Sequence, residues 1–195
     1  MPFAFSHQKT TQALAYLARR SGGTLNKMKA LKLIFFADRY QFRRFGRPIT
    51  GDTYFAMEYG PVPSGTKDLT ENSVFLSEEE RGYASGFIQP VDPFTFRSVV
   101  EPDLRWLAPS DVEALEWSWI NFGNKDQYVL ADYTHRYPEW KRWESSLKNQ
   151  SRIPMDYRDF LSDPEDADPC YPLSPEKRIA MEEGLADVAA FESRW

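Results

Sequence analysis

Apolar residues recur every three or four positions near the start of the chain, which predicts a helix over residues 7–20. Leu14 and Leu17 lie on its apolar face. Ser6 can cap its first turn, and the pair of glycines that begins at Gly22 can end it.

A second, longer helix is predicted to run from its cap at Asn26 to Phe45, where Gly46 ends it. Its apolar positions cover almost the whole circumference of the helix instead of one stripe. We expect such a helix in the centre of the fold, because none of its faces favours water.

The pattern then changes to that of a short strand followed by a short helix. Thr53–Tyr59 has the composition of a strand. Gly60, Pro61 and Pro63 are expected to end this strand, and a helix over residues 64–72 is expected to follow it.

The middle of the chain has a weaker pattern. Residues 73–105 are predicted to form a loop with two strands, at Gly86–Val91 and Thr95–Val100. Ser110 and Glu113 have the spacing of a capping box, which predicts that a further helix begins there.

Composition changes in the last part of the chain. A helix over residues 126–136 is expected to lead into residues 144–173, which are rich in Pro, Asp and Ser. Within that stretch, Ile153–Leu161 could be helical. Ser174 can cap a final helix that continues through Ala190 and has a proline in its first turn.

These elements predict an α+β fold that is mostly α, with a small antiparallel β-sheet and a compact helical core around the buried second helix. Two parts are expected. The first is a domain over residues 1–143, and the second is an extension over residues 144–195, made of an acidic, proline-rich connector and the final helix.

Composition also restricts the class of function. The net charge of −5 disfavours nucleic acid as the main partner, because nucleic-acid binders usually carry a basic surplus. The single cysteine, Cys170, cannot form an internal disulfide, which fits a reducing compartment. No apolar run approaches the roughly 20 residues that span a bilayer. We therefore expect a cytoplasmic protein without membrane contact.

Few residues are candidates for catalysis. Neither of the two histidines has a nucleophile at an informative spacing, and no hydrolase, zinc, phosphate-loop or dinucleotide motif occurs. Asp38, Asp52 and Glu58 could converge as the cluster of a carboxylate-dependent metal hydrolase. Each could equally be structural, and we favour that interpretation. No enzyme activity, metal or cofactor is expected.

Basic and aromatic residues are better candidates for contact with a partner. Lys32, Arg39 and Arg43 share roughly one face of the second helix, and Arg47 follows it. They could grip an acidic partner or phosphates, or they could form the solvated edge of a buried helix. Tyr137 and Trp140 could fill the core, but such rings are also typical of interface hot spots.

The strand near the middle of the chain offers another possible contact surface. Tyr54 and Tyr59 lie on opposite faces of it, because their separation is odd. Prolines on both sides of the strand stiffen the adjoining loops, which lowers the entropy lost on docking. This segment is either a contact site or a keystone of the fold, and the sequence leaves both possibilities open.

A family resemblance rests on two segments. Residues 29–69, KALKLIFFADRYQFRRFGRPITGDTYFAMEYGPVPSGTKDL, resemble the core of the Panacea antitoxin domain, which also occurs in SocA-like and phage-associated proteins. Residues 130–140, LADYTHRYPEW, are similar to a later segment of that family. The resemblance extends over roughly residues 10–143.

The resemblance implies an antitoxin that neutralises a cognate protein toxin, encoded nearby, by direct binding. It also implies an alternative, in which a proteolysis adaptor delivers the bound toxin to a protease, with residues 144–195 as a possible tether. The residues expected to contact the partner are Arg39, Arg43, Arg47, Asp52, Tyr54, Tyr59, Pro61, Pro63, His135, Tyr137 and Trp140.

Overall fold

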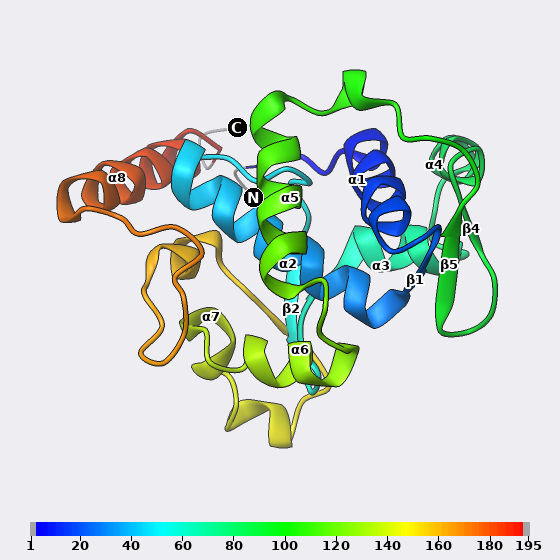
Figure 1. Ribbon diagram of the computed structural model, residues 1–195. Helices are drawn as coiled ribbons and strands as arrows, with labels where there is room; N and C mark the ends of the chain where they lie inside the picture. The colour runs from blue at the N-terminus through cyan, green and yellow to red at the C-terminus, as the bar shows by residue number, and fades with distance from the viewer. Residues whose placement is uncertain (1–2, 193–195) are drawn as a thin grey trace.

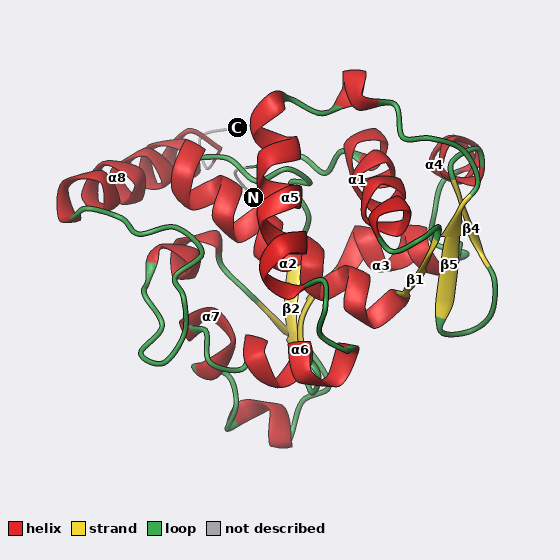
Figure 2. Ribbon diagram, viewed as in Figure 1, coloured by secondary structure: helices red, strands yellow, loops and turns green. Residues whose placement is uncertain are grey.

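The computed structural model describes residues 3–192 and has an α+β fold dominated by helices. The long helix α2 (Lys27–Phe45) runs through the centre, and the other helices and two small antiparallel sheets surround it (Figures 1 and 2). The predicted fold class and the predicted central helix are therefore confirmed. No helix in residues 3–192 is long and apolar enough to cross a membrane.

The first two helices begin where the sequence predicts. Ser6 caps α1 (His7–Arg20) by accepting a hydrogen bond from the backbone of Lys9, and Asn26 caps α2 in the same way. Gly46 ends α2 in the left-handed conformation, at a φ of 78°. Every residue of α2 from Ala30 to Arg43 is buried, because α1, α3, α5, α6 and the strand β3 all pack against it.

Helix α5 (Pro109–Phe122) packs along α2 but starts differently from the prediction. The expected capping box at Ser110 and Glu113 is wrong, because the N-cap lies two positions earlier. Ala108 is the N-cap, and its backbone N–H donates to the Asp111 carboxylate over 3.0 Å. A proline in the first turn fixes this start, since its φ suits a helix and it lacks an N–H to satisfy.

The first sheet has the strand order β3-β2-β6 and centres on a tight hairpin. Strands β2 (Tyr54–Met57) and β3 (Gly60–Pro63) pair antiparallel, and β6 (Ile153–Pro154) lies on the other side of β2. The expectation that Gly60, Pro61 and Pro63 end the strand is wrong, because they form the second strand of the hairpin. Prolines are tolerated there because β3 is an edge strand.

The second sheet has the strand order β1-β5-β4. Strands β4 (Ile88–Pro90) and β5 (Thr95–Ser98) confirm the two predicted strands in shorter form. Strand β1 (Thr24–Asn26) and helix α4 (Glu78–Ser85) were not predicted. Helix α4 buries a single residue, Ala84, so it has almost no apolar periodicity to reveal it.

The other helices connect these layers. Helices α3 and α6 match the predictions for residues 64–72 and 126–136, whereas α7 is an unpredicted single turn, and α8 is the predicted final helix. Their bounds are α3 (Ser64–Glu71), α6 (Gln127–Thr134), α7 (Pro138–Lys141), α8 (Pro175–Glu192), and the 3₁₀ turns η1 (Leu104–Trp106), η2 (Ser146–Lys148) and η3 (Tyr157–Leu161).

Residues 153–171 pack into the same core as the rest of the chain. The predicted helix at Ile153–Leu161 is instead the strand β6 followed by the 3₁₀ turn η3, and Phe160 and Leu161 are fully buried. The expected boundary between 1–143 and 144–195 therefore does not coincide with a break in packing. Residues 1–2 and 193–195 of those two parts lie outside the described residues.

Candidate functional site

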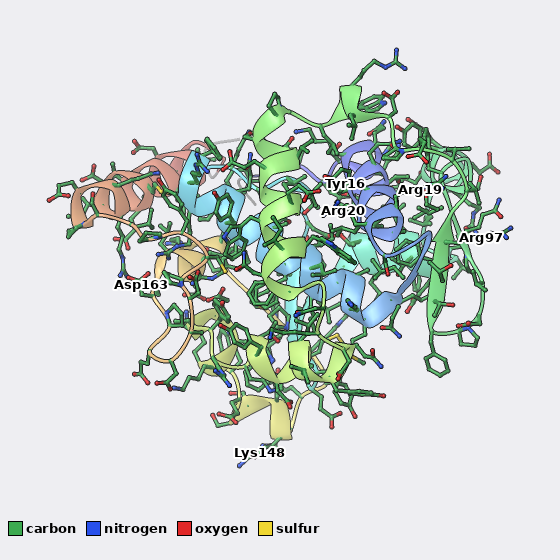
Figure 3. The ribbon with its side chains drawn as sticks, in the orientation of Figure 1. Tyr16, Arg19, Arg20, Arg97, Lys148 and Asp163 are labelled. Carbon is green, nitrogen blue, oxygen red and sulfur yellow. The ribbon has the colours of Figure 1, made fainter. Side chains whose placement is uncertain are left out.

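A groove of about 1170 Å³ opens on one side of the molecule. The start of α2, the β2–β3 hairpin, α3 and the β4–β5 turn line one part of it. The first turn of α6, α7 and residues 147–151 line the other part. Lys148, which also lines the groove, projects at the lower edge of the molecule in Figure 3.

Three aromatic side chains at the groove are exposed to solvent. They come from three separate elements: the hairpin turn, the β4–β5 turn and the first turn of α6. Tyr59 is 51% exposed, Phe94 is 72% exposed and Tyr128 is 59% exposed. Large rings usually avoid water, so this concentration of exposed rings around one concave surface is typical of a binding site.

The apolar lining of the groove includes flexible and rigid side chains. Met28 of α2 and Met57 of β2 supply thioethers, which adapt to differently shaped ligands. The Trp140 indole is buried, and its Nε1 donates to the carbonyl of Met57 over 2.8 Å. This hydrogen bond ties α7 to the hairpin and fixes the shape of the groove.

His135 lies behind Trp140 and does not line the groove. Its imidazole stacks on the indole, with ring centroids 3.6 Å apart and an angle of 12° between the planes. Burial lowers the pKa of His135, and the nearby positive charge of Lys32 lowers it further. The histidine is therefore neutral at pH 7 and supports the tryptophan structurally.

Lys32 lines the groove although only 1% of its surface is exposed. Its ammonium donates to the carbonyl of Pro61 over 2.8 Å, and burial lowers its pKa to about 7. Gly60 lies against it with a φ of 91°, and a Cβ at that position would overlap the Thr134 hydroxyl. Glycine therefore lets the hairpin close over the lysine.

Two buried aspartates hold the segment that carries the hairpin. Asp38 accepts hydrogen bonds from the backbone of Ile49 over 2.8 Å and of Thr50 over 3.1 Å, and from the Tyr54 hydroxyl over 2.9 Å. Burial raises the pKa of the Asp38 carboxyl to about 6, although these hydrogen bonds oppose the shift. Tyr54 is thus an internal support of the hairpin.

Asp52 fixes the beginning of α3. Its carboxylate accepts hydrogen bonds from the backbone of Gly65 over 2.8 Å and from the backbone and hydroxyl of Thr66 over 2.7 Å. The suggested convergence of Asp38, Asp52 and Glu58 is wrong, since Glu58 lies exposed in the hairpin turn. Among residues 3–192, no group of three or more His, Cys, Asp or Glu side chains could hold a metal ion.

The interpretation of Arg39 and Arg43 as the solvated edge of the second helix is also wrong, because both side chains are fully buried. Arg39 pairs with Glu139, and Arg43 donates to the carbonyls of Phe160 over 2.9 Å and of Tyr171 over 2.7 Å. Arg43 also pairs with Asp163, which lies on the loop after η3 (Figure 3). These arginines anchor the C-terminal part of the chain and have no free surface to offer a partner.

Other predicted contact residues lie away from the groove lining. Arg47 follows the opposite end of α2 and pairs with Asp111 over 2.8 Å. Tyr137 is buried, and its hydroxyl donates to the carbonyl of Asp168 over 2.7 Å. Cys170 is a free, buried thiol whose pKa burial raises to about 12. Of the predicted contact residues, Tyr59 and Trp140 line the groove, while Asp52, Tyr54, Pro61 and Pro63 support the hairpin.

Sequence reasoning missed Phe94 and Tyr128. Phe94 stands between Pro93 and Thr95 in the turn that joins β4 and β5. An apolar ring in such a turn is the signal that could have identified it as a contact residue. The sequence groups Lys32 with Arg39 and Arg43 as a possible grip for an acidic partner, but it does not predict the burial of Lys32, because a lysine on a helix is ordinarily solvated.

Comparison with known families gives one match. The family described as "Antitoxin SocA-like, Panacea domain" matches residues 31–141, which is more than half of the chain. The matched region includes the β2–β3 hairpin, α6 and α7. No curated protein and no solved structure matches the chain.

Proposed function

We propose that this chain, which belongs to the SocA-like Panacea antitoxin family, neutralises a protein toxin by seating part of it in the groove beside the β2–β3 hairpin. Family membership supports a role in a toxin–antitoxin system with a cognate toxin as partner. Binding at the groove would block the toxin without any catalytic step. Such a partnership would place the chain in the cytoplasm.

The observation that carries this proposal is the set of exposed rings around the groove. Tyr59, Phe94 and Tyr128 present apolar surface to water in the free protein. Burying such rings against a partner supplies much of the binding free energy at protein interfaces. The groove also has the concave shape that lets one segment of a partner be enclosed on several sides.

The rigidity of the hairpin favours binding as well. Buried hydrogen bonds to Asp38 and Asp52 hold its base, and the Trp140 indole holds its tip. A surface that is already ordered loses little conformational entropy when a partner docks. The methionines in the lining can still adjust to the side chains of the partner.

Co-expression tests the proposal directly. The chain is expressed in cells together with the product of the neighbouring gene, whose toxicity alone is first established. We expect relief of growth arrest and a complex that co-purifies through an affinity tag on the chain. Continued growth arrest together with the lack of a complex would contradict the proposal.

The exposed position of α8 favours a second candidate function, that of a proteolysis adaptor. This helix projects from the body of the molecule (Figure 1), and Glu176, Ile179 and Glu183 on it are exposed. A protease could contact α8 while the toxin occupies the groove. Deleting residues 174–195 should then spare toxin binding and abolish toxin degradation in cells.

A further inference from the structure

Lys32 is a buried cation without a buried anion to neutralise it. Its ammonium donates a hydrogen bond to the Pro61 carbonyl, and no ion pair joins it to a carboxylate within residues 3–192. An ammonium group removed from water without a counter-charge costs stability. A hydrophobic residue of similar length would fill the same space without this cost, so the charge itself needs an explanation.

The charged groups around Lys32 do not supply that counter-charge. On α3, Glu71 is already paired with Lys67 over 2.7 Å. Glu58 in the hairpin turn and Glu144 after α7 are both exposed and line the groove. Burial is the only cause that lowers the pKa of Lys32, so no neighbouring carboxylate offsets it.

The remaining charged or titratable neighbours are positive or neutral. Lys27 of α2 donates to the carbonyls of Asp92 and Pro93, and Lys148 is exposed. His135, after α6, is neutral at pH 7 because Lys32 and burial lower its pKa. The groove around Lys32 therefore favours a negative ligand group.

We propose that the toxin segment seated in the groove is apolar and carries an aspartate or glutamate whose carboxylate pairs with Lys32. This inference rests on the proposed function and specifies the chemistry of the partner. Besides Lys32, the groove lining includes Phe94 of the β4–β5 turn and Leu147 of η2. An apolar segment that contacts both of these residues would extend past Lys32, so we assign the carboxylate to a side chain and not to a chain terminus.

Binding of a carboxylate should be linked to proton uptake. The free lysine titrates at about pH 7, and a paired carboxylate raises its pKa. Only the protonated lysine forms the pair, so the affinity should fall by up to about tenfold per pH unit above pH 7. Neutral His135 would not produce this dependence, because it titrates below that range.

Calorimetric titration with the inactivated product of the neighbouring gene tests the inference. Wild type is compared with Lys32→Gln, which keeps an N–H donor for the Pro61 carbonyl but removes the charge. Lys141→Gln is the matched control, because it removes an exposed lysine that does not line the groove. Circular dichroism of each variant establishes that it is folded.

We expect Lys32→Gln to weaken binding at about pH 6.5 by at least about tenfold and to abolish the pH dependence. Lys141→Gln should leave the affinity and its pH dependence nearly unchanged. One Asp→Asn or Glu→Gln change in the toxin should weaken its binding to the wild-type chain by the same factor. The same toxin change should not weaken binding to the Lys32→Gln variant any further. Extending the toxin's C-terminus by one residue should have no effect.

Three outcomes would overturn the inference or its premise. Equal affinity and equal pH dependence for wild type and Lys32→Gln would overturn the inference alone. Loss of binding only on extension of the toxin's C-terminus would overturn the assignment to a side chain. Failure of the wild-type chain to bind the toxin would overturn the proposed function. A measurable wild-type complex therefore shows that any other negative result concerns the inference about Lys32 alone.

Discussion

Arg39 of α2 and Glu139 of α7 lie 100 residues apart in the chain and form a fully buried ion pair, with Arg39 Nε 2.7 Å from Glu139 Oε1. The same guanidinium donates to the carbonyl of Ser162 over 2.6 Å. The Arg39 side chain thus connects the central helix α2, the short helix α7 and the C-terminal part of the chain.

Arg39→Met should lower the free energy of unfolding by about 3–5 kcal/mol, because it leaves the Glu139 carboxylate buried without a counter-charge. Adding Glu139→Leu to it should restore part of this loss, since the double variant has no uncompensated charge. Urea unfolding followed by circular dichroism measures both. Strictly additive losses in the double variant would contradict the interpretation of the two residues as a pair.

Gly60→Ala should destabilise the protein more than Gly22→Ala does. Both glycines have positive φ, 91° and 84°, but only at Gly60 would the new Cβ overlap another atom, the Thr134 hydroxyl. The change at Gly22 should cost about 1 kcal/mol from backbone strain alone. The change at Gly60 should cost at least about 2 kcal/mol more, because the hairpin must also move away from α6. Equal melting temperatures for the two variants would disprove the close contact.

Stability should rise with pH between about 7 and 9.5 because of Lys32. Its pKa is about 7 in the folded protein and 10.5 in the reference state, so in this range the unfolded chain holds the proton more tightly. Raising the pH therefore favours the folded state, by up to about 3 kcal/mol over this range. The measurement is the difference in unfolding free energy between wild type and Lys32→Gln at each pH. A constant difference across the range would show that Lys32 is not desolvated.

Two truncations should behave in opposite ways. Deleting residues 174–195 removes α8, and the remaining chain should melt cooperatively and keep its toxin affinity. Deleting residues 153–195 should prevent folding, because Arg39 and Arg43 lose the acceptors that satisfy their buried guanidinium groups. Thermal melts show whether each truncated chain unfolds cooperatively and at what temperature. A cooperative melt of the shorter chain near the wild-type temperature would contradict the role given to residues 153–171.

The sequence predicted those features whose causes lie close together in the chain. Ser6, Asn26 and Gly46 were identified as helix ends, because a cap acts on backbone groups within one turn. The burial of Arg43 was not predictable in this way. Its acceptors, the carbonyls of Phe160 and Tyr171, lie 117 and 128 residues further along.

The groove was predicted only in part for the same reason. The sequence predicts the strand at Thr53–Tyr59 with stiff, proline-containing loops on both sides, and Tyr59 is among the predicted contact residues. The groove also requires a turn from a second sheet, which brings Phe94, and a helix that brings Tyr128. Only the tertiary arrangement places these distant rings around one hollow.

The central claim, that the toxin binds in the groove, is tested most directly by the toxin affinity of variants that remove one exposed ring each. Tyr59→Ser, Phe94→Ser and Tyr128→Ser are compared with Phe75→Ser, which removes a ring that is 86% exposed outside the groove. We predict that at least one groove variant loses about 30-fold or more in affinity, as expected for a hot spot, while Phe75→Ser binds like wild type. Wild-type affinity in all three groove variants would contradict the claim.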